Sequence, residues 1–144
     1  MQYLELKDIL SFAQNIAIEG NGNGHYIAAT LIEDLYSEEE IKVVYPRHIF
    51  PREEYQKKSE ILVFLDDKLC IVTADNKEYD VTIIKYQEIR KVNYKANRYE
   101  QDPAVLIIEL SNGSEIILDS NQDCNVHWVF KYNSKIKQVF HLFK

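Results

Sequence analysis

The 144-residue sequence has few cysteines and no long apolar run. Two cysteines, Cys70 and Cys124, are too few for the disulfide framework of a small secreted domain. The longest aliphatic and aromatic run is ILVFL, far below the roughly 18 residues that a transmembrane helix needs. The opening residues MQYLELKD lack the basic and apolar regions of a secretory signal peptide. We therefore expect a reduced protein in the cytoplasm.

Basic charge is also scarce in this sequence. Lys and Arg together number 17 against 23 Asp and Glu, which gives a net charge of −6. An acidic protein gains no general attraction to nucleic acid or to anionic membranes, so we expect neither as a partner. Residues 121–144 are the exception, because they hold four lysines against Asp123 alone.

Three of the four glycines stand close together in EGNGNGHYIAA, residues 19–29, which resembles a phosphate-binding loop. Apolar residues at helical spacing predict a helix over residues 6–17, which Gly20 ends. A dinucleotide fingerprint instead needs a strand before its glycines, and a P-loop needs Lys and Ser or Thr where His25 and Tyr26 stand. We therefore expect no nucleotide and no other cofactor, and interpret the glycines, Gly24 included, as a flexible connection between a helix and a strand.

The segment before residue 60 gives mixed signals. Residues 25–36 fit either a strand or a helix, and the acidic run SEEE, residues 37–40, fits a solvated helix start or turn. IKVVYPRHIF, residues 41–50, predicts a short strand that Pro46 breaks. Residues 51–60 are charged and form a connector. We call residues 1–59 the N-terminal helix and mixed segment.

From residue 60 onward the sequence is rich in strand-forming residues. A hairpin is predicted around Asp66 and Asp67, and residues 79–99 predict one or two further strands. The last 20 residues predict an amphipathic helix capped by Ser120, Asn121 or Asp123. Its apolar face is predicted to contain the following residues: Val126, Val129, Phe130, Ile136, Val139, Phe140 and Phe143. The order of elements predicts an α+β fold in a single domain, residues 1–144.

The stretch LIIELSNGSEIILDS predicts a second hairpin, and its pattern selects the register. A three-residue turn ending at Gly113 pairs Leu106 with Leu118 and Ile108 with Ile116, which gathers the apolar side chains on one face. A two-residue turn would mix apolar and acidic side chains on both faces. We therefore predict the longer turn, with Gly113 at positive φ.

The order of ILVFLDDKLCIVTAD, IIKYQEIRKV, LIIELSNGSEIILDS and the final helix resembles the bacterial pleckstrin-homology-like (PH-like) domains over residues 60–144. EEIKVVYP would supply the first strand. The resemblance implies hairpins that curl into a partly open barrel closed by the last helix. It also implies a binding or assembly module without catalytic residues, and it carries over no site. The content of Ile, Lys, Asn and Tyr resembles that of proteins from low-GC bacteria.

The segment KYQEIRKVNYKANRY interleaves cations with tyrosines. Cations beside stacking aromatic rings hold single-stranded nucleic acid or phosphorylated ligands. The same alternation also arises when a strand turns its tyrosines to one face and its cations to water. The candidate residues for an anionic ligand are Lys85, Arg90, Lys91, Tyr94, Lys95 and Arg98.

Signals for metal binding and catalysis are incomplete. Cys124 and His127 are spaced to face one metal ion, but two ligands do not make a zinc site. DSNQDC begins like a calcium-binding loop, but Cys124 and Phe130 stand where glycine and glutamate are needed. No serine lies in a nucleophile elbow. We therefore expect no metal and no catalytic residue.

The leading hypothesis is a non-catalytic protein-interaction or self-assembly module. Its open sheet edge or a groove beside a helix would receive a protein partner or a second copy of the chain. One alternative is a module that binds an anionic ligand through Lys85 to Arg98. A second alternative is an enzyme whose site is assembled from residues distant in the sequence.

Overall fold

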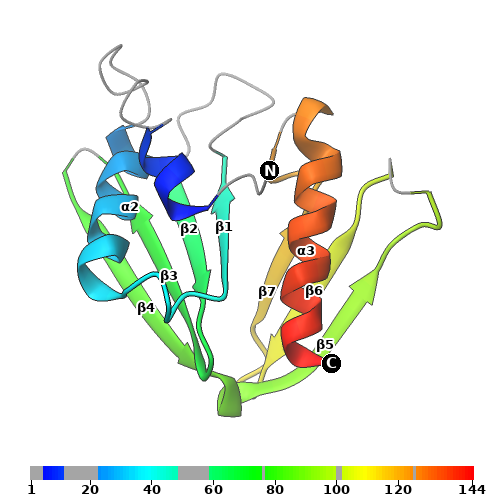
Figure 1. The fold of residues 1–144 in the computed structure, drawn as a ribbon. Helices are drawn as coiled ribbons and strands as arrows, with labels where there is room; N and C mark the ends of the chain where they lie inside the picture. The colour runs from blue at the N-terminus through cyan, green and yellow to red at the C-terminus, as the bar shows by residue number, and fades with distance from the viewer. Residues whose placement is uncertain (1–4, 12–22, 49–58, 76, 100–101, 125) are drawn as a thin grey trace. The chain divides into compact units, whose positions relative to one another are not determined.

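The computed structural model describes residues 5–11, 23–48, 59–75, 77–99, 102–124 and 126–144. The chain divides into two compact units: unit 1 is residues 1–49 and 54–84, and unit 2 is residues 50–53 and 85–144. Helices and two antiparallel sheets confirm the predicted α+β class (Figure 1). The described strands form two separate sheets, with no closed barrel among them. The single domain spanning residues 1–144 stays a prediction.

Unit 1 contains a four-stranded sheet with one helix against it. Its elements are a helical segment at residues 6–11, α2 (Asn23–Leu35), β1 (Val43–Arg47), β2 (Ser59–Phe64), β3 (Lys68–Ala74) and β4 (Tyr79–Lys85). The strands are ordered β1-β2-β3-β4, and α2 packs against β2 and β3. Leu6 and Ile9 are buried, as the predicted first helix requires. The rest of that prediction, residues 12–17 and Gly20, lies outside the described residues.

Gly24 corrects the interpretation of the glycine loop. It lies in the first turn of α2, so the structure continues into a helix rather than a strand. A Cβ atom on Gly24 would clash with the Ser59 hydroxyl and would lie 2.7 Å from the Ala74 carbonyl oxygen. Gly24 therefore allows α2 to approach β2 and β3 closely. The other two glycines of the loop, Gly20 and Gly22, are outside the described residues.

The segment that leads from α2 into β2 differs from prediction at Pro46 and at the end of the connector. SEEE forms a turn, in which Ser37 Oγ donates to Glu40 Oε1 at 3.1 Å. Pro46 does not break the following strand, because it lies inside β1 opposite Ile61. Since β1 is at the edge of the sheet, a residue without an N–H is tolerated there. The described part of the predicted connector is Ser59 and Glu60, which begin β2; residues 51–58 are not described.

The predicted hairpin around Asp66 and Asp67 is confirmed. β2 and β3 pair antiparallel from Ser59 with Ala74 to Phe64 with Leu69. The Leu65 N–H donates to the Lys68 carbonyl at 2.9 Å across the turn.

Unit 2 contains a three-stranded sheet and the C-terminal helix. Its elements are a 3₁₀ turn (Tyr86–Glu88), β5 (Ile89–Lys95), β6 (Val105–Leu110), β7 (Glu115–Asp119), a second 3₁₀ turn (Val126–Trp128) and α3 (Val129–Phe143). The strands are ordered β5-β6-β7. The buried residues Leu106, Ile108 and Leu118 of the sheet and Ile136 and Val139 of α3 belong to its core.

The β6–β7 hairpin has the predicted register. Leu106 pairs with Leu118 and Ile108 pairs with Ile116. Gly113 has φ +88°, and its N–H donates to the Leu110 carbonyl at 2.9 Å. The three-residue turn is therefore confirmed.

The apolar face of α3 was predicted only in part. Val129, Ile136 and Val139 are buried, but Val126 and Phe130 are 66% and 58% exposed. Val126 belongs to the 3₁₀ turn, and Phe130 lies about 100° around the helix from Val129.

The predicted N-caps of α3 are wrong. The helix begins after Trp128, which makes no side-chain capping hydrogen bond. Ser120 instead accepts a hydrogen bond from the Ala104 N–H at 2.9 Å, and Asp123 accepts one from the Asp119 N–H at 2.8 Å. Ser120 and Asp123 lie just after β7, several residues before α3. Their hydrogen bonds therefore stabilise the end of β7 and do not cap the helix.

Candidate functional site

The structure places two of the three tyrosines of the segment 85–99 against α3, whereas Tyr99 is 75% exposed beside Arg98. The Tyr94 ring stacks on Phe140 of α3 at a centroid distance of 4.9 Å, and Tyr86 meets Phe143 edge-on at 5.0 Å. Exposed side chains are found at Lys85, Arg90, Lys91, Lys95 and Arg98. Side chains of α3 therefore already occupy part of the ring surface of Tyr86 and Tyr94. Binding of an anionic ligand by this segment stays a prediction.

Arg90 lies where the register between β5 and β6 shifts. Its guanidinium forms an ion pair with Glu109 of β6. Lys91 lies opposite Glu109 in the strand register, so two basic residues of β5 lie near the same carboxylate. The positive charge of β5 is therefore partly neutralised by its own sheet.

The two residues considered for zinc differ in burial. Cys124 is fully buried, and its thiol donates to the Ser120 carbonyl at 3.1 Å. His127 is exposed. Among the described residues, no group of three or more His, Cys, Asp and Glu side chains is placed to hold a metal ion.

Several buried groups of unit 1 have shifted pKa values. Burial lowers the pKa of His25 to about 4, and the hydrogen bond to the Arg47 carbonyl acts in the opposite direction. The His25 Nε2 lies 2.7 Å from that oxygen, so the neutral ring donates there. Burial also raises the pKa of the Cys70 thiol, although a hydrogen bond with Tyr36 lowers it in part. A protonated thiol is a poor nucleophile, and the His25 ring already uses its Nε2 on the Arg47 carbonyl.

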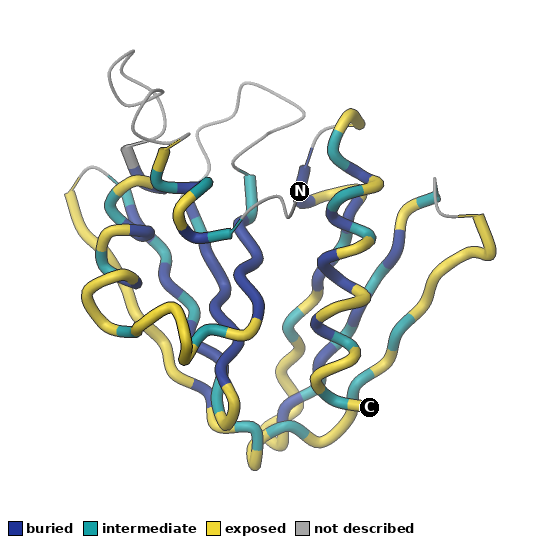
Figure 2. Tube along the Cα trace, in the orientation of Figure 1, coloured by how far each residue is buried: buried dark blue, intermediate teal, exposed yellow. Residues whose placement is uncertain are grey.

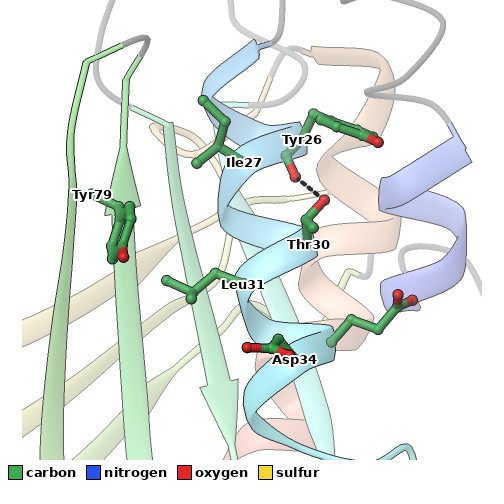
Figure 3. Close-up of a pocket in the computed structure, with 7 residues that line it drawn as sticks. Tyr26, Ile27, Thr30, Leu31, Asp34 and Tyr79 are labelled. Carbon is green, nitrogen blue, oxygen red and sulfur yellow. Dashed lines mark hydrogen bonds between the residues drawn. The ribbon is translucent and has the colours of Figure 1, made fainter.

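A surface groove of about 520 Å³ runs along α2 in unit 1 and is bordered by Tyr79 of β4 (Figure 3). We call it the α2–β4 groove. It is lined by Tyr26, Ile27, Thr30, Leu31, Glu33, Asp34 and Tyr79. Ile27, Leu31 and Tyr79 lie toward one another in the close-up (Figure 3). Its volume is in the range of known binding pockets.

Tyr79 lines the groove, and the apolar stripe to which it belongs continues beyond the groove along β4; we call this stripe the floor. Tyr79, Val81 and Ile83 are 60%, 37% and 53% exposed, although β4 belongs to a sheet whose other strands are largely buried (Figure 2). Side chains two residues apart on a strand share a face. Because Tyr79 lines the groove, Val81 and Ile83 also lie on the face that carries α2. Ile84, on the opposite face, is buried.

A stripe on α2, of which Ile27 and Leu31 line the groove, is called the wall. Ile27, Leu31 and Leu35 are spaced by four residues, so they lie along one side of the helix. Ile27 and Leu31 are half-buried and Leu35 is 46% exposed, whereas Ala28 and Ile32 are fully buried. Since α2 packs against β2 and β3, this stripe and the adjacent face of β4 keep exposed apolar side chains, namely Leu35, Tyr79, Val81 and Ile83.

Negative charge accompanies this apolar surface. The groove is lined by two carboxylates, Glu33 and Asp34, and none of its lining residues is Lys, Arg or His. Unit 1 as a whole has 15 acidic and seven basic residues, a balance of −8. Unit 2 has eight acidic and ten basic residues, a balance of +2. The acidity of the sequence is therefore concentrated in the unit that contains the groove.

Sequence analysis did not identify this site. Two signals for it were present: the alternation Tyr79, Val81, Ile83 and the spacing Ile27, Leu31, Leu35. Each one alone indicates ordinary core packing. Only the position of α2 over β2 and β3 leaves both stripes exposed.

A family model described as a protein of unknown function, DUF3908, matches residues 3–134. The chain belongs to the DUF3908 family. None of the curated proteins or solved structures compared with this DUF3908 chain gave a match. The matched range includes every residue that lines the α2–β4 groove. Within the described residues of this DUF3908 chain, no helix is long and apolar enough to cross a membrane.

Proposed function

We propose that this DUF3908 protein is a non-catalytic protein-interaction module that receives a protein partner in the α2–β4 groove. The observation that carries the proposal is the uncovered apolar surface shared by α2 and β4. Tyr79, Ile83 and Leu35 are each about half exposed or more. Contiguous exposed apolar side chains on a soluble protein mark binding surfaces, because a partner that covers them removes them from water.

The chemistry of the groove supports binding rather than catalysis. Its polar side chains are Tyr26, Thr30, Glu33 and Asp34. Catalytic acids, bases and nucleophiles often have a shifted pKa. None of the described groups with a clearly shifted pKa lines the groove; these groups are His25, Tyr36, Cys70 and Tyr132.

We also propose a PH-like fold of the bacterial type and a cytoplasmic location. A four-stranded antiparallel sheet, a three-stranded one and then an amphipathic helix follow the order that the resemblance implies, with β1 as the first strand. Cys70 and Cys124 are buried and form no disulfide bond, which suits a reducing compartment.

Two matched substitutions test the proposed function. Ile83→Ser changes the groove floor on β4, and Ile117→Ser makes the same change on β7, where the side chain is similarly exposed at 46%. Proteins crosslinked to the tagged chain in its native host would be compared between the two variants. We expect at least one crosslinked protein that is lost with Ile83→Ser and with Leu31→Ser but retained with Ile117→Ser. Retention of the same proteins by all three variants would contradict the proposal.

A second candidate function is binding of an anionic ligand at β5. It is favoured by the balance of +2 in unit 2 and by the exposed side chains of Lys91 and Lys95. A labelled single-stranded oligonucleotide titrated at increasing salt tests it. For this candidate the affinity falls steeply with ionic strength and is reduced by Lys91→Gln and Lys95→Gln. A groove that binds mainly through apolar contacts changes little with salt.

A further inference from the structure

The two apolar stripes of the α2–β4 groove have matching lengths. From Tyr79 to Ile83, four steps along a strand cover about 13 Å. From Ile27 to Leu35, eight steps along a helix cover about 12 Å. The floor and the wall therefore form a trough in which one short element would contact both stripes at once.

The backbone hydrogen bonds of a bound segment determine whether a helix or an extended strand fits the groove. A segment lying on the face of β4 finds no backbone partner there, since the N–H and C=O groups of a strand point within the plane of the sheet. It must therefore satisfy its own backbone groups, as an α-helix does. An extended segment would instead pair with the edge of β4. It would then lie about 4.8 Å further out, away from Ile27 and Leu31.

The carboxylates around the groove determine which charged side chains are favoured on the flank of the bound helix. Asp34 lies at the rim of the wall, on the same side of α2 as Ile27 and Leu31 (Figure 3). Glu33 also lines the groove, within a unit whose balance is −8. Lys or Arg beside these carboxylates would gain attraction, whereas Asp or Glu would be repelled.

We propose that the α2–β4 groove binds an amphipathic α-helix of a partner protein, with apolar residues toward Leu31 and Ile83 and with Lys or Arg toward Asp34. This inference rests on the proposed function and specifies the chemistry of the partner. The occupant is not α3 of a second copy, although α3 is basic and amphipathic. Its apolar residues Val129, Ile136 and Val139 are already buried.

A designed peptide tests the proposal on the full chain. The probe is a fluorescent, acetylated and amidated peptide of about 14 residues, built from Leu, Lys and Ala. Its leucines follow the spacing i, i+4, i+7 so that they form one stripe when the peptide is helical. A second peptide replaces every Lys with Glu, and a third carries Pro at its centre, which breaks the helix but permits an extended segment. Binding is measured by fluorescence anisotropy.

The expected results separate the contributions of charge, helical conformation and apolar contact to the affinity of the peptide. The Lys peptide binds, and the Glu and Pro peptides bind at least about tenfold more weakly. Ile83→Ser weakens the Lys peptide about tenfold, while Ile117→Ser leaves it unchanged. Asp34→Asn weakens it about twofold to fivefold, while Glu39→Gln, an equal charge change in the exposed 37–40 turn, does not. Thermal unfolding verifies that each variant is folded, and Val81→Ser replaces Ile83→Ser if that variant unfolds.

Three results would overturn the proposal. Equal binding of the Pro and Lys peptides would show that an extended segment is accepted. Equal weakening by Ile83→Ser and Ile117→Ser, or by Asp34→Asn and Glu39→Gln, would show that the peptide binds elsewhere. A crosslinked host protein that depends on Ile83 but is not displaced by the Lys peptide would overturn the helical partner while leaving the proposed function intact.

Discussion

At the scale of single residues, buried polar groups connect stability to pH. His25 is 4% exposed and is held neutral by its burial, and its Nε2–H donates to the Arg47 carbonyl. In the unfolded chain the same ring has an ordinary pKa of 6.5, against about 4 in the folded protein. Between these values the unfolded state binds more protons, so the free energy of unfolding falls as the pH is lowered.

We predict that His25→Gln reduces this pH dependence. The wild-type protein should lose up to about 3 kcal/mol through His25 between pH 6.5 and pH 4, and the loss should be complete below the folded pKa. Urea unfolding at several pH values measures it as the difference between wild type and variant. His127→Gln, at an exposed position, is the control and should follow the wild type. If the free energy of unfolding depended on pH equally in wild type and His25→Gln, the pH dependence could not come from His25.

Residues whose role depends on tertiary contacts were not predictable. Gly24 was interpreted as part of a flexible loop, but the nearby Ser59 and Ala74 explain why it is a glycine. Pro46 was interpreted as a strand breaker, because the sequence does not show that β1 lies at a sheet edge. In both cases the deciding neighbour lies more than ten residues away in the sequence.

At the scale of elements, sequence patterns within one hairpin were sufficient to predict its strand register. The register of β6 and β7 follows from the alternation of apolar residues and from Gly113, which are all local. The α2–β4 groove was missed for the opposite reason. Its two stripes are some 50 residues apart, and each resembles core packing until the position of α2 is known.

The β6–β7 turn gives a stability prediction for two of its residues, Gly113 and Ser111. Gly113→Ala should lower the free energy of unfolding by about 1 kcal/mol, because φ +88° is unfavourable for a residue with a Cβ. No atom lies near enough to clash with the added methyl group, so the cost is conformational. Ser111→Ala removes one exposed hydrogen bond to the Glu88 carbonyl and should change stability by less than about 0.5 kcal/mol. Urea midpoints at constant m-value compare them; equal effects would contradict the turn assignment.

At the scale of the whole molecule, the net charge of −6 hides an uneven distribution. The balances of −8 and +2 appear only when the residues are assigned to the two units. That assignment needs the fold, because unit 1 ends at Ile84, inside β4, and the sequence shows no linker there. The total charge was therefore enough to argue against nucleic acid and anionic membranes as partners. It did not indicate where on the protein the acidic residues would gather.

The last prediction concerns whether the units unfold together. Unit 1 has 80 residues and unit 2 has 64, sizes at which a single core rarely supplies more than about 3–5 kcal/mol. We therefore expect one cooperative transition, as the predicted single domain implies. Ile32→Ala in unit 1 and Ile136→Ala in unit 2 each remove a fully buried side chain and should cost about 2–5 kcal/mol. Trp128, the only tryptophan, reports on unit 2 by fluorescence. If the chain is one domain, Ile32→Ala shifts the Trp128 transition as far as the one seen by circular dichroism. A Trp128 transition that moves with Ile136→Ala but not with Ile32→Ala would show that the units unfold independently.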